Sequence, residues 1–95
     1  MVLRTRKGRE AEALVLVAID DLWKERGFAP TVREIGARIG MAHSAVHNYV
    51  RSLAEAGLVH DEPHIARSIR LSAAGMQRVD AERSGSGVEA AVAAQ

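Results

Sequence analysis

Apolar residues near the start of the chain recur at the spacing of an amphipathic helix. Between residues 9 and 26 they fall at positions 11, 14, 15, 18, 19 and 22, which share one helical face. Leu16, Val17 and Trp23 widen this stripe, so we expect the helix to be covered on more than one side, with Trp23 in the core. Gly27 is a natural end to the helix, and Pro30 favours an extended connector after it.

A second and a third helix follow closely. Thr31 and Glu34 have the spacing of a capping box, which predicts a helix start at Thr31, and Gly40 is well placed for a left-handed end. After a tight turn at residues 41–43, a third helix is predicted over residues 44–56. Its apolar residues Val46, Tyr49, Val50 and Leu53 are predicted to face inward, whereas His47, Asn48, Arg51 and Glu55 face out.

Two short strands and a weaker helix complete the pattern. Residues 58–61 form a candidate strand, residues 62–64 are typical of a turn, and residues 68–71 alternate polar and apolar side chains as a half-buried strand does. Three helices followed by a two-stranded β-hairpin predict a mainly α fold, the winged helix-turn-helix. Ser72 is a candidate cap for a weaker C-terminal helix over residues 73–83, which has Gly75 near its start.

The second and third predicted helices carry the functional signal. A helix-turn-helix joins two helices by a short turn that often contains glycine. Gly36 lies where the two helices approach closely, Gly40 makes the turn, and Val46 anchors the second helix of the pair. The alternative is an ordinary three-helix bundle with a glycine in one turn, and the predicted wing favours the DNA-binding version.

Composition limits the other possibilities. The chain has 95 residues, 13 Lys and Arg against 12 Asp and Glu, and no Cys. This length fits one domain with a tail, and the lack of Cys excludes disulfides and thiolate zinc sites. The longest apolar run, residues 13–19, is too short to span a membrane, so we expect a soluble, cytoplasmic, nucleoid-associated protein.

The near-neutral net charge conceals a basic N-terminal arm over residues 1–8, which contains Arg4, Arg6 and Lys7. Taken alone, such an arm is a solvated terminus; beside a DNA-binding domain it is a candidate phosphate contact. The predicted organisation is this arm, a winged helix-turn-helix domain over residues 9–71, a C-terminal helix over residues 72–83 and a flexible tail over residues 84–95. The tail opens with Ser-Gly-Ser-Gly, and its Ala-rich end fits either a helix or disorder.

One stretch resembles a known family. The run Ala29-Pro30-Thr31-Val32-Arg33-Glu34-Ile35-Gly36, continuing to Gly40-Met41, is similar to the DNA-binding domain of the LexA repressors. The similarity extends to Val46-His47, Leu53, Gly57-Leu58-Val59 and residues 67–71. The resemblance implies a winged helix-turn-helix that represses transcription by binding a palindromic operator as a dimer.

The sequence also departs from that family. The turn after Gly40 is one residue shorter than in LexA, so the LexA operator is not transferred to this chain. The 95 residues contain no counterpart of the family's self-cleaving peptidase domain, so we expect no Ser-Lys autoproteolysis. Residues 71–75 are similar to the strand-to-helix join of MarR-type winged-helix regulators.

Base-reading residues follow from the expected docking of the second helix of the motif in the major groove. Its N-terminal residues His43, Ser44, His47 and Asn48 would reach base edges. Asn48 is the best candidate reader, because a side-chain amide can pair bidentately with adenine, and His47 could donate to guanine or a phosphate. Ser44 has an alternative role as the helix cap.

Backbone contacts are predicted around this helix. Arg51, one turn beyond His47, is a phosphate contact, and Thr31 and Arg33 hold the DNA backbone from the preceding helix. Arg33 has the alternative of a plain solvated surface charge. His64 and Arg67 let the wing touch phosphate or the minor groove, although Asp61 and Glu62 beside them argue against a strongly basic wing.

Other classes of function are weaker. His43/His47 and His60/His64 are spaced four apart, but no Cys or motif carboxylate accompanies them, so we predict no metal, no cofactor and no small-molecule ligand. No nucleophile, base and orienting group converge, so we predict no enzyme. A homodimer on double-stranded DNA is the leading prediction, with Trp23 and the C-terminal helix as candidate dimer surfaces. A winged-helix protein-interaction module is the alternative.

Overall fold

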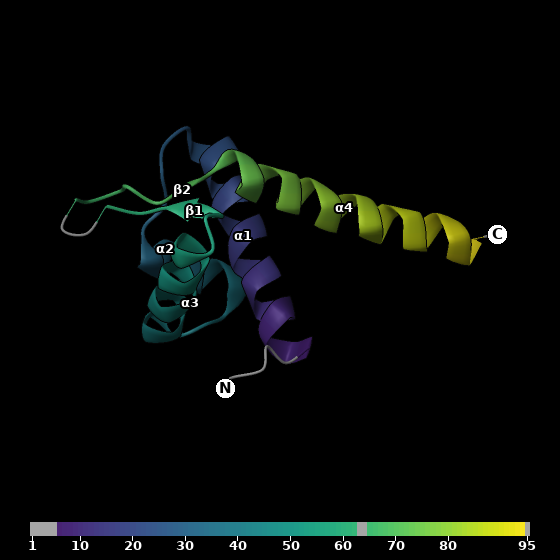
Figure 1. Ribbon diagram of the computed structural model, residues 1–95, viewed down its shortest axis with the longest axis horizontal. Coiled ribbons are helices and arrows are strands. Elements are labelled where there is room, and N and C mark those ends of the chain that lie inside the picture. Colours follow the sequence, from purple (N-terminus) through teal and green to yellow (C-terminus); the bar gives the residue numbers. More distant parts are fainter. Residues whose placement is uncertain (1–5, 63–64, 95) are drawn as a thin grey trace.

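The computed structural model describes the backbone of residues 6–62 and 65–94. Its elements, in chain order, are α1 (Arg6–Arg26), α2 (Val32–Ile39), α3 (His43–Glu55), β1 (Val59–His60), β2 (Arg70–Leu71) and α4 (Ala73–Ala94). The two strands pair antiparallel, with Val59 opposite Leu71 and His60 opposite Arg70. Figure 1 shows the hairpin and α3 on one side of α1, with α4 leaving toward the other. The predicted mainly α winged helix-turn-helix is confirmed.

Two predicted boundaries are wrong. Helix α1 begins at Arg6, so residues 6–8 of the predicted arm are helical; residues 1–5 lie outside the described part of the chain. Helix α4 runs on to Ala94 through the predicted Ser-Gly-Ser-Gly linker at residues 84–87. A helix that is already nucleated extends at little cost. Each glycine destabilises the helix by about 1 kcal/mol, and the high helix propensity of the alanines near its end offsets this cost.

The core forms around α1. The side chains of Val15, Leu16, Ile19 and Leu22 are buried, together with residues of α2, α3, β1 and α4, and the half-buried Leu71 of β2 packs against them. Two residues of the predicted buried stripe are not in the core: Leu14 is 53% exposed and Trp23 is 42% exposed. The other elements cover α1 over only part of its circumference, and α4 diverges from the N-terminal half of α1, which leaves Leu14 uncovered (Figure 1).

The predicted start and end of α2 are confirmed. The Thr31 hydroxyl accepts from the Glu34 backbone N–H at 3.1 Å, and the Glu34 carboxylate accepts from the Thr31 N–H at 2.8 Å. This reciprocal pair satisfies two amide groups that a helix start would otherwise leave unbonded. Gly40 adopts φ 69° and ψ 37°, the left-handed conformation in which glycine avoids a steric penalty.

Close backbone approaches fix two other glycines. A Cβ on Gly36 would lie 2.5 Å from the Met41 carbonyl oxygen, as the predicted tight helix-turn-helix packing requires. A Cβ on Gly75 would lie 2.0 Å from the Leu58 carbonyl oxygen, so this glycine lets α4 start against the connection between α3 and β1. Ser72 caps α4 as predicted, because its hydroxyl accepts from the Gly75 N–H at 3.0 Å and donates to the Gly57 carbonyl at 2.6 Å.

The Gly36 contact predicts a reversal of the usual helix-propensity rule. In an open helix, Gly→Ala stabilises by about 0.5–1 kcal/mol. We expect Gly36→Ala instead to destabilise the fold by about 1–3 kcal/mol in urea unfolding, because the new methyl group meets a backbone carbonyl. Ala37→Ser, on the exposed face of the same helix, should change stability by less than about 0.5 kcal/mol. A Gly36→Ala protein as stable as wild type would contradict the packing.

Candidate nucleic-acid interface

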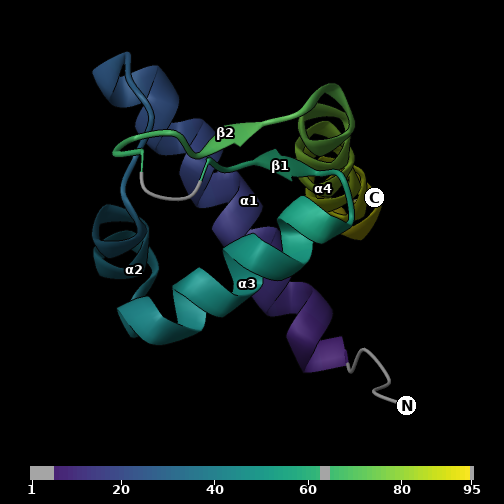
Figure 2. The ribbon, with the colours of Figure 1, turned by 60° about the vertical axis from the view of Figure 1, so that its left-hand side comes forward.

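Helix α3 has one buried face and one exposed polar face. Val46, Val50 and Leu53 are completely buried. On the other face, the exposed residues Ser44, His47, Asn48 and Arg51 follow the i, i+3, i+4, i+7 spacing of a single stripe. Figure 2 shows α3 on the outer side of the domain, lying across α1. The core therefore fixes the helix while a row of hydrogen-bonding side chains points outward.

The start of α3 differs from one prediction. Ala42 is the N-cap residue, and no side chain caps the helix, so the alternative role of Ser44 as a cap is wrong. His43 and Ser44 are the first two helical residues, and both are exposed. The first amides of a helix have no partner within it, and the helix dipole makes this end attractive to anions. The start of α3 thus offers imidazole, hydroxyl and backbone N–H donors together.

Thr31 and Arg33, the two DNA contacts predicted at the start of α2, differ in how much of their hydrogen-bonding capacity is free. The Thr31 hydroxyl oxygen accepts the capping hydrogen bond, which leaves its proton as a donor. Arg33 is exposed, and its side chain makes no hydrogen bond or ion pair within the described residues. Both roles in DNA contact stay predictions, as do those of His43, Ser44, His47, Asn48 and Arg51.

Arg67 has a structural role that sequence reasoning missed. Its guanidinium lies 4.7 Å from the centre of the Phe28 ring and donates to Glu34 at 2.8 Å and to the Ala29 carbonyl at 3.2 Å. These contacts attach the wing to the connector before α2, and they accompany a left-handed backbone at Arg67, with φ 55°. The aromatic Phe28 in the connector could have suggested a partner for a cation, but Arg67 lies 39 positions away along the chain, and no local sequence pattern reveals a contact at that separation. Arg67 stays a predicted DNA contact. His64, the other predicted DNA contact of the wing, lies outside the described residues.

Ion pairs neutralise the three acidic residues in the C-terminal half of α1. Asp20 binds Lys24 and Arg83, Asp21 binds Arg83, and Glu25 binds Arg38. The side chain of Arg51, like that of Arg33, has no acidic partner within the described residues. Arg33 and Arg51 are therefore the arginines of α2 and α3 that remain available to a phosphate, whereas Arg38 is bound to Glu25. Among the described residues, no three His, Cys, Asp or Glu side chains gather where they could hold a metal ion.

Glu34 joins three elements through its carboxylate. It accepts from Thr31, from Arg67 and from Arg26 at the end of α1. The backbone N–H of Thr31, followed by the Arg67 guanidinium, lowers the pKa of Glu34 below its ordinary value of 4.5. The Arg38 guanidinium likewise lowers the pKa of Glu25.

These lowered pKa values predict the sign of an acid effect. A carboxylate with a depressed folded-state pKa stabilises the fold above its unfolded pKa, and that contribution is lost as the pH falls through the folded value. We expect the melting temperature of the wild-type protein to decrease as the pH is lowered below about 4.5. The Glu34→Gln variant should be less stable than wild type at pH 7, and its melting temperature should decrease less steeply with acid.

Glu55→Gln is the matched control for this titration, because Glu55 is exposed on α3 and its side chain makes no ion pair within the described residues. Its melting curve should follow wild type across the pH range. Equal acid slopes for Glu34→Gln and wild type would contradict the role of Glu34.

The fold and the exposed stripe on α3 together define a winged helix-turn-helix domain with a presented recognition helix. Among the described residues, no helix has the length and apolar character needed to cross a membrane. The family model described as the LexA DNA binding domain matches residues 7–68. The chain belongs to this family, and the resemblance inferred from the sequence is confirmed.

Individual relatives agree with this assignment. The chain is 36% identical over 64 residues to the LexA repressor of Oenococcus oeni, a match that covers 66% of this chain and 30% of that repressor. It is 33% identical over 81 residues to the LexA repressor of Lacticaseibacillus casei, covering 84% of this chain and 39% of the relative. It is 38% identical over 60 residues to the LexA repressor of Bacillus thuringiensis, a match that covers 62% of this chain and 28% of that repressor. The chain thus spans well under half the length of these curated relatives.

Proposed function

We propose that this protein is a sequence-specific double-stranded DNA-binding regulator, acting as a transcriptional repressor, that reads the major groove with α3. The observation that carries the proposal is the exposed Ser44–His47–Asn48–Arg51 stripe, which is held rigidly from behind by three completely buried side chains. The family and the name of the LexA repressors support a repressor rather than an activator. Such a protein acts in the cytoplasm at the nucleoid, and the proposal requires no catalytic step.

The exposed side chains divide into two roles. His43, Ser44, His47 and Asn48 are assigned to base edges, with Asn48 as the residue that specifies adenine. Arg51, Thr31 and Arg33 are assigned to the phosphate backbone, which fixes register without reading sequence. The wing residues Arg67 and His64 complete the backbone contacts, and Arg67 would share its guanidinium between phosphate and Glu34.

Selection from random-sequence duplexes tests the proposal. We expect wild type to enrich a two-fold symmetric site, and Asn48→Ala to bind that site more weakly by about 1–3 kcal/mol per half-site with relaxed preference at one base pair. Weak binding without an enriched sequence would contradict sequence-specific readout. No binding even at low salt would replace the proposal with a winged-helix protein-interaction module.

Arg51→Ala should behave differently, because a phosphate contact carries no sequence information. We expect weaker binding to all duplexes and a salt slope reduced by about one unit per subunit, measured from affinities at several salt concentrations. Lys24→Ala removes the same charge from a residue paired with Asp20 near α4, and it should leave the slope unchanged. A changed base preference in Arg51→Ala would instead make it a base reader.

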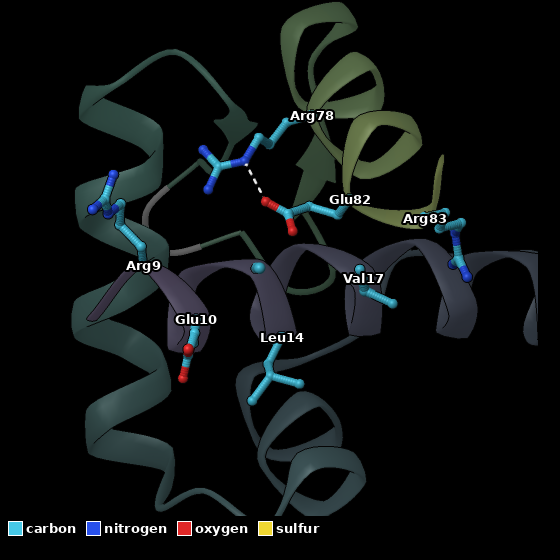
Figure 3. A pocket seen from close by; sticks show the side chains of 8 residues that line it. Arg9, Glu10, Leu14, Val17, Arg78, Glu82 and Arg83 are labelled. Carbon is cyan, nitrogen blue, oxygen red and sulfur yellow. Dashed lines mark hydrogen bonds and ion pairs between the residues drawn. The ribbon is translucent and has the colours of Figure 1, made fainter. Parts of the chain in front are cut away.

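We also propose that the protein binds DNA as a homodimer through the notch between α1 and α4. The notch is lined by Leu14 and Val17 of α1 and by Arg78, Glu82 and Arg83 of α4. Figure 3 shows Arg78 and Glu82 joined by their hydrogen bond on one side of α1, with Leu14 projecting from the opposite side of that helix. Both helices contribute charges of both signs to the lining, which is compatible with self-association about a two-fold axis. Because α4 projects away from α3 (Figure 1), this pairing leaves both recognition helices accessible.

The dimer surface predicts different effects for two similarly exposed apolar residues. Leu14→Glu should shift the protein toward monomer in sedimentation and weaken binding to a two-site operator at least tenfold, with half-site affinity unchanged. Met76→Glu, at a residue 55% exposed compared with 53% for Leu14, should leave assembly unchanged. Equal dimerisation of both variants would exclude the notch as the interface.

A further inference from the structure

A separate hollow lies on another side of α1, between its C-terminal half, the hairpin and the first turn of α4. It encloses about 430 Å³ and is lined by Ile19, Asp20, Trp23, His60, Arg70, Leu71 and Met76. This volume is within the range of about 300–1,000 Å³ that small-molecule sites occupy. None of the proposed DNA contacts lines it.

Part of the hollow is lined by large apolar side chains that are exposed to water, which is energetically unfavourable. Trp23 and Met76 are 42% and 55% exposed, although both are large apolar side chains, and the half-buried Leu71 lies between the elements that carry them. An indole face and a thioether both make favourable contacts with a planar aromatic ring. The surface therefore favours an aromatic ligand over an aliphatic one.

The polar part of the hollow is cationic. His60 and Arg70 pair directly across the two strands, which places both side chains on the same face of the hairpin. The Arg70 side chain makes no hydrogen bond or ion pair within the described part of the chain. Asp20, the acid at this rim, already binds Lys24 and Arg83, so it does not neutralise Arg70. A planar guanidinium of this kind matches the two oxygens of a carboxylate.

We propose that this hollow binds a small aromatic monocarboxylate, with the ring between Trp23 and Met76 and the carboxylate on Arg70 and His60. The inference does not depend on the proposed DNA binding. It implies that ligand occupancy ties the hairpin to α1 and α4, because each of these elements contributes to the walls.

Trp23 provides a direct readout, since it is the one tryptophan in the chain and gives a single indole N–H resonance. We would titrate the full chain with 4-tert-butylbenzoate and, separately, with the corresponding neutral amide. The acid should shift this resonance with a dissociation constant on the order of 1 mM or tighter. The amide should bind at least about tenfold more weakly, because it lacks the charge that Arg70 binds.

Two variants separate the site from general charge effects. Arg70→Gln should weaken acid binding about tenfold and leave amide binding unchanged, whereas Arg33→Gln, which removes the same charge on α2, should change neither. The backbone spectrum of each variant shows whether it is folded. The proposal would be overturned by equal affinity for acid and amide, or by equal effects of the two variants. It would also be overturned if the Trp23 resonance did not shift at 10 mM acid, which is about ten times the expected dissociation constant.

Discussion

The position of the recognition helix depends on one close contact between α2 and the turn that follows it. At Gly36 the Met41 carbonyl oxygen lies where a larger residue would place its Cβ, and Val46 packs beside it. This approach allows Val46, Val50 and Leu53 to reach completely buried positions against α1. Because a helix is rigid, fixing these three side chains also fixes the direction of the polar residues on its opposite face.

The wing depends on a second constraint, the carboxylate of Glu34. This one side chain caps α2, binds Arg26 at the end of α1 and binds Arg67 of the wing. Each exposed ion pair is individually weak, but together they hold three elements in one arrangement. The same acid that organises the domain would also reduce the positive charge that Arg67 offers to a phosphate in the proposed complex. In the proposed complex, affinity for DNA would therefore depend mainly on α3 and on Arg33, with the wing contributing position more than charge.

Local sequence signals predicted most of this arrangement, and long-range contacts account for what they missed. The capping box at Thr31, the left-handed Gly40 and the inward face of α3 are determined by neighbours within a few positions, and all three were predictable. The exposure of Leu14 and Trp23 was not, because apolar periodicity shows which residues share a face but not how far a partner extends over it. The Arg67–Phe28 contact and the continuation of α4 likewise depend on tertiary geometry and helix extension. Of the candidate site, the outward position of His47, Asn48 and Arg51 was predicted and their contacts with DNA stay predictions, whereas the capping role of Ser44 was wrong.

The central claim, that α3 is the surface that meets DNA, is tested most directly by mapping backbone amide chemical shifts during titration with the selected duplex. The account predicts the largest changes at residues 43–51, smaller changes at the start of α2 and in the wing, and unchanged signals around Trp23 and along the packed part of α4. The largest changes on α1 and α4, with residues 43–51 unaffected, would contradict it.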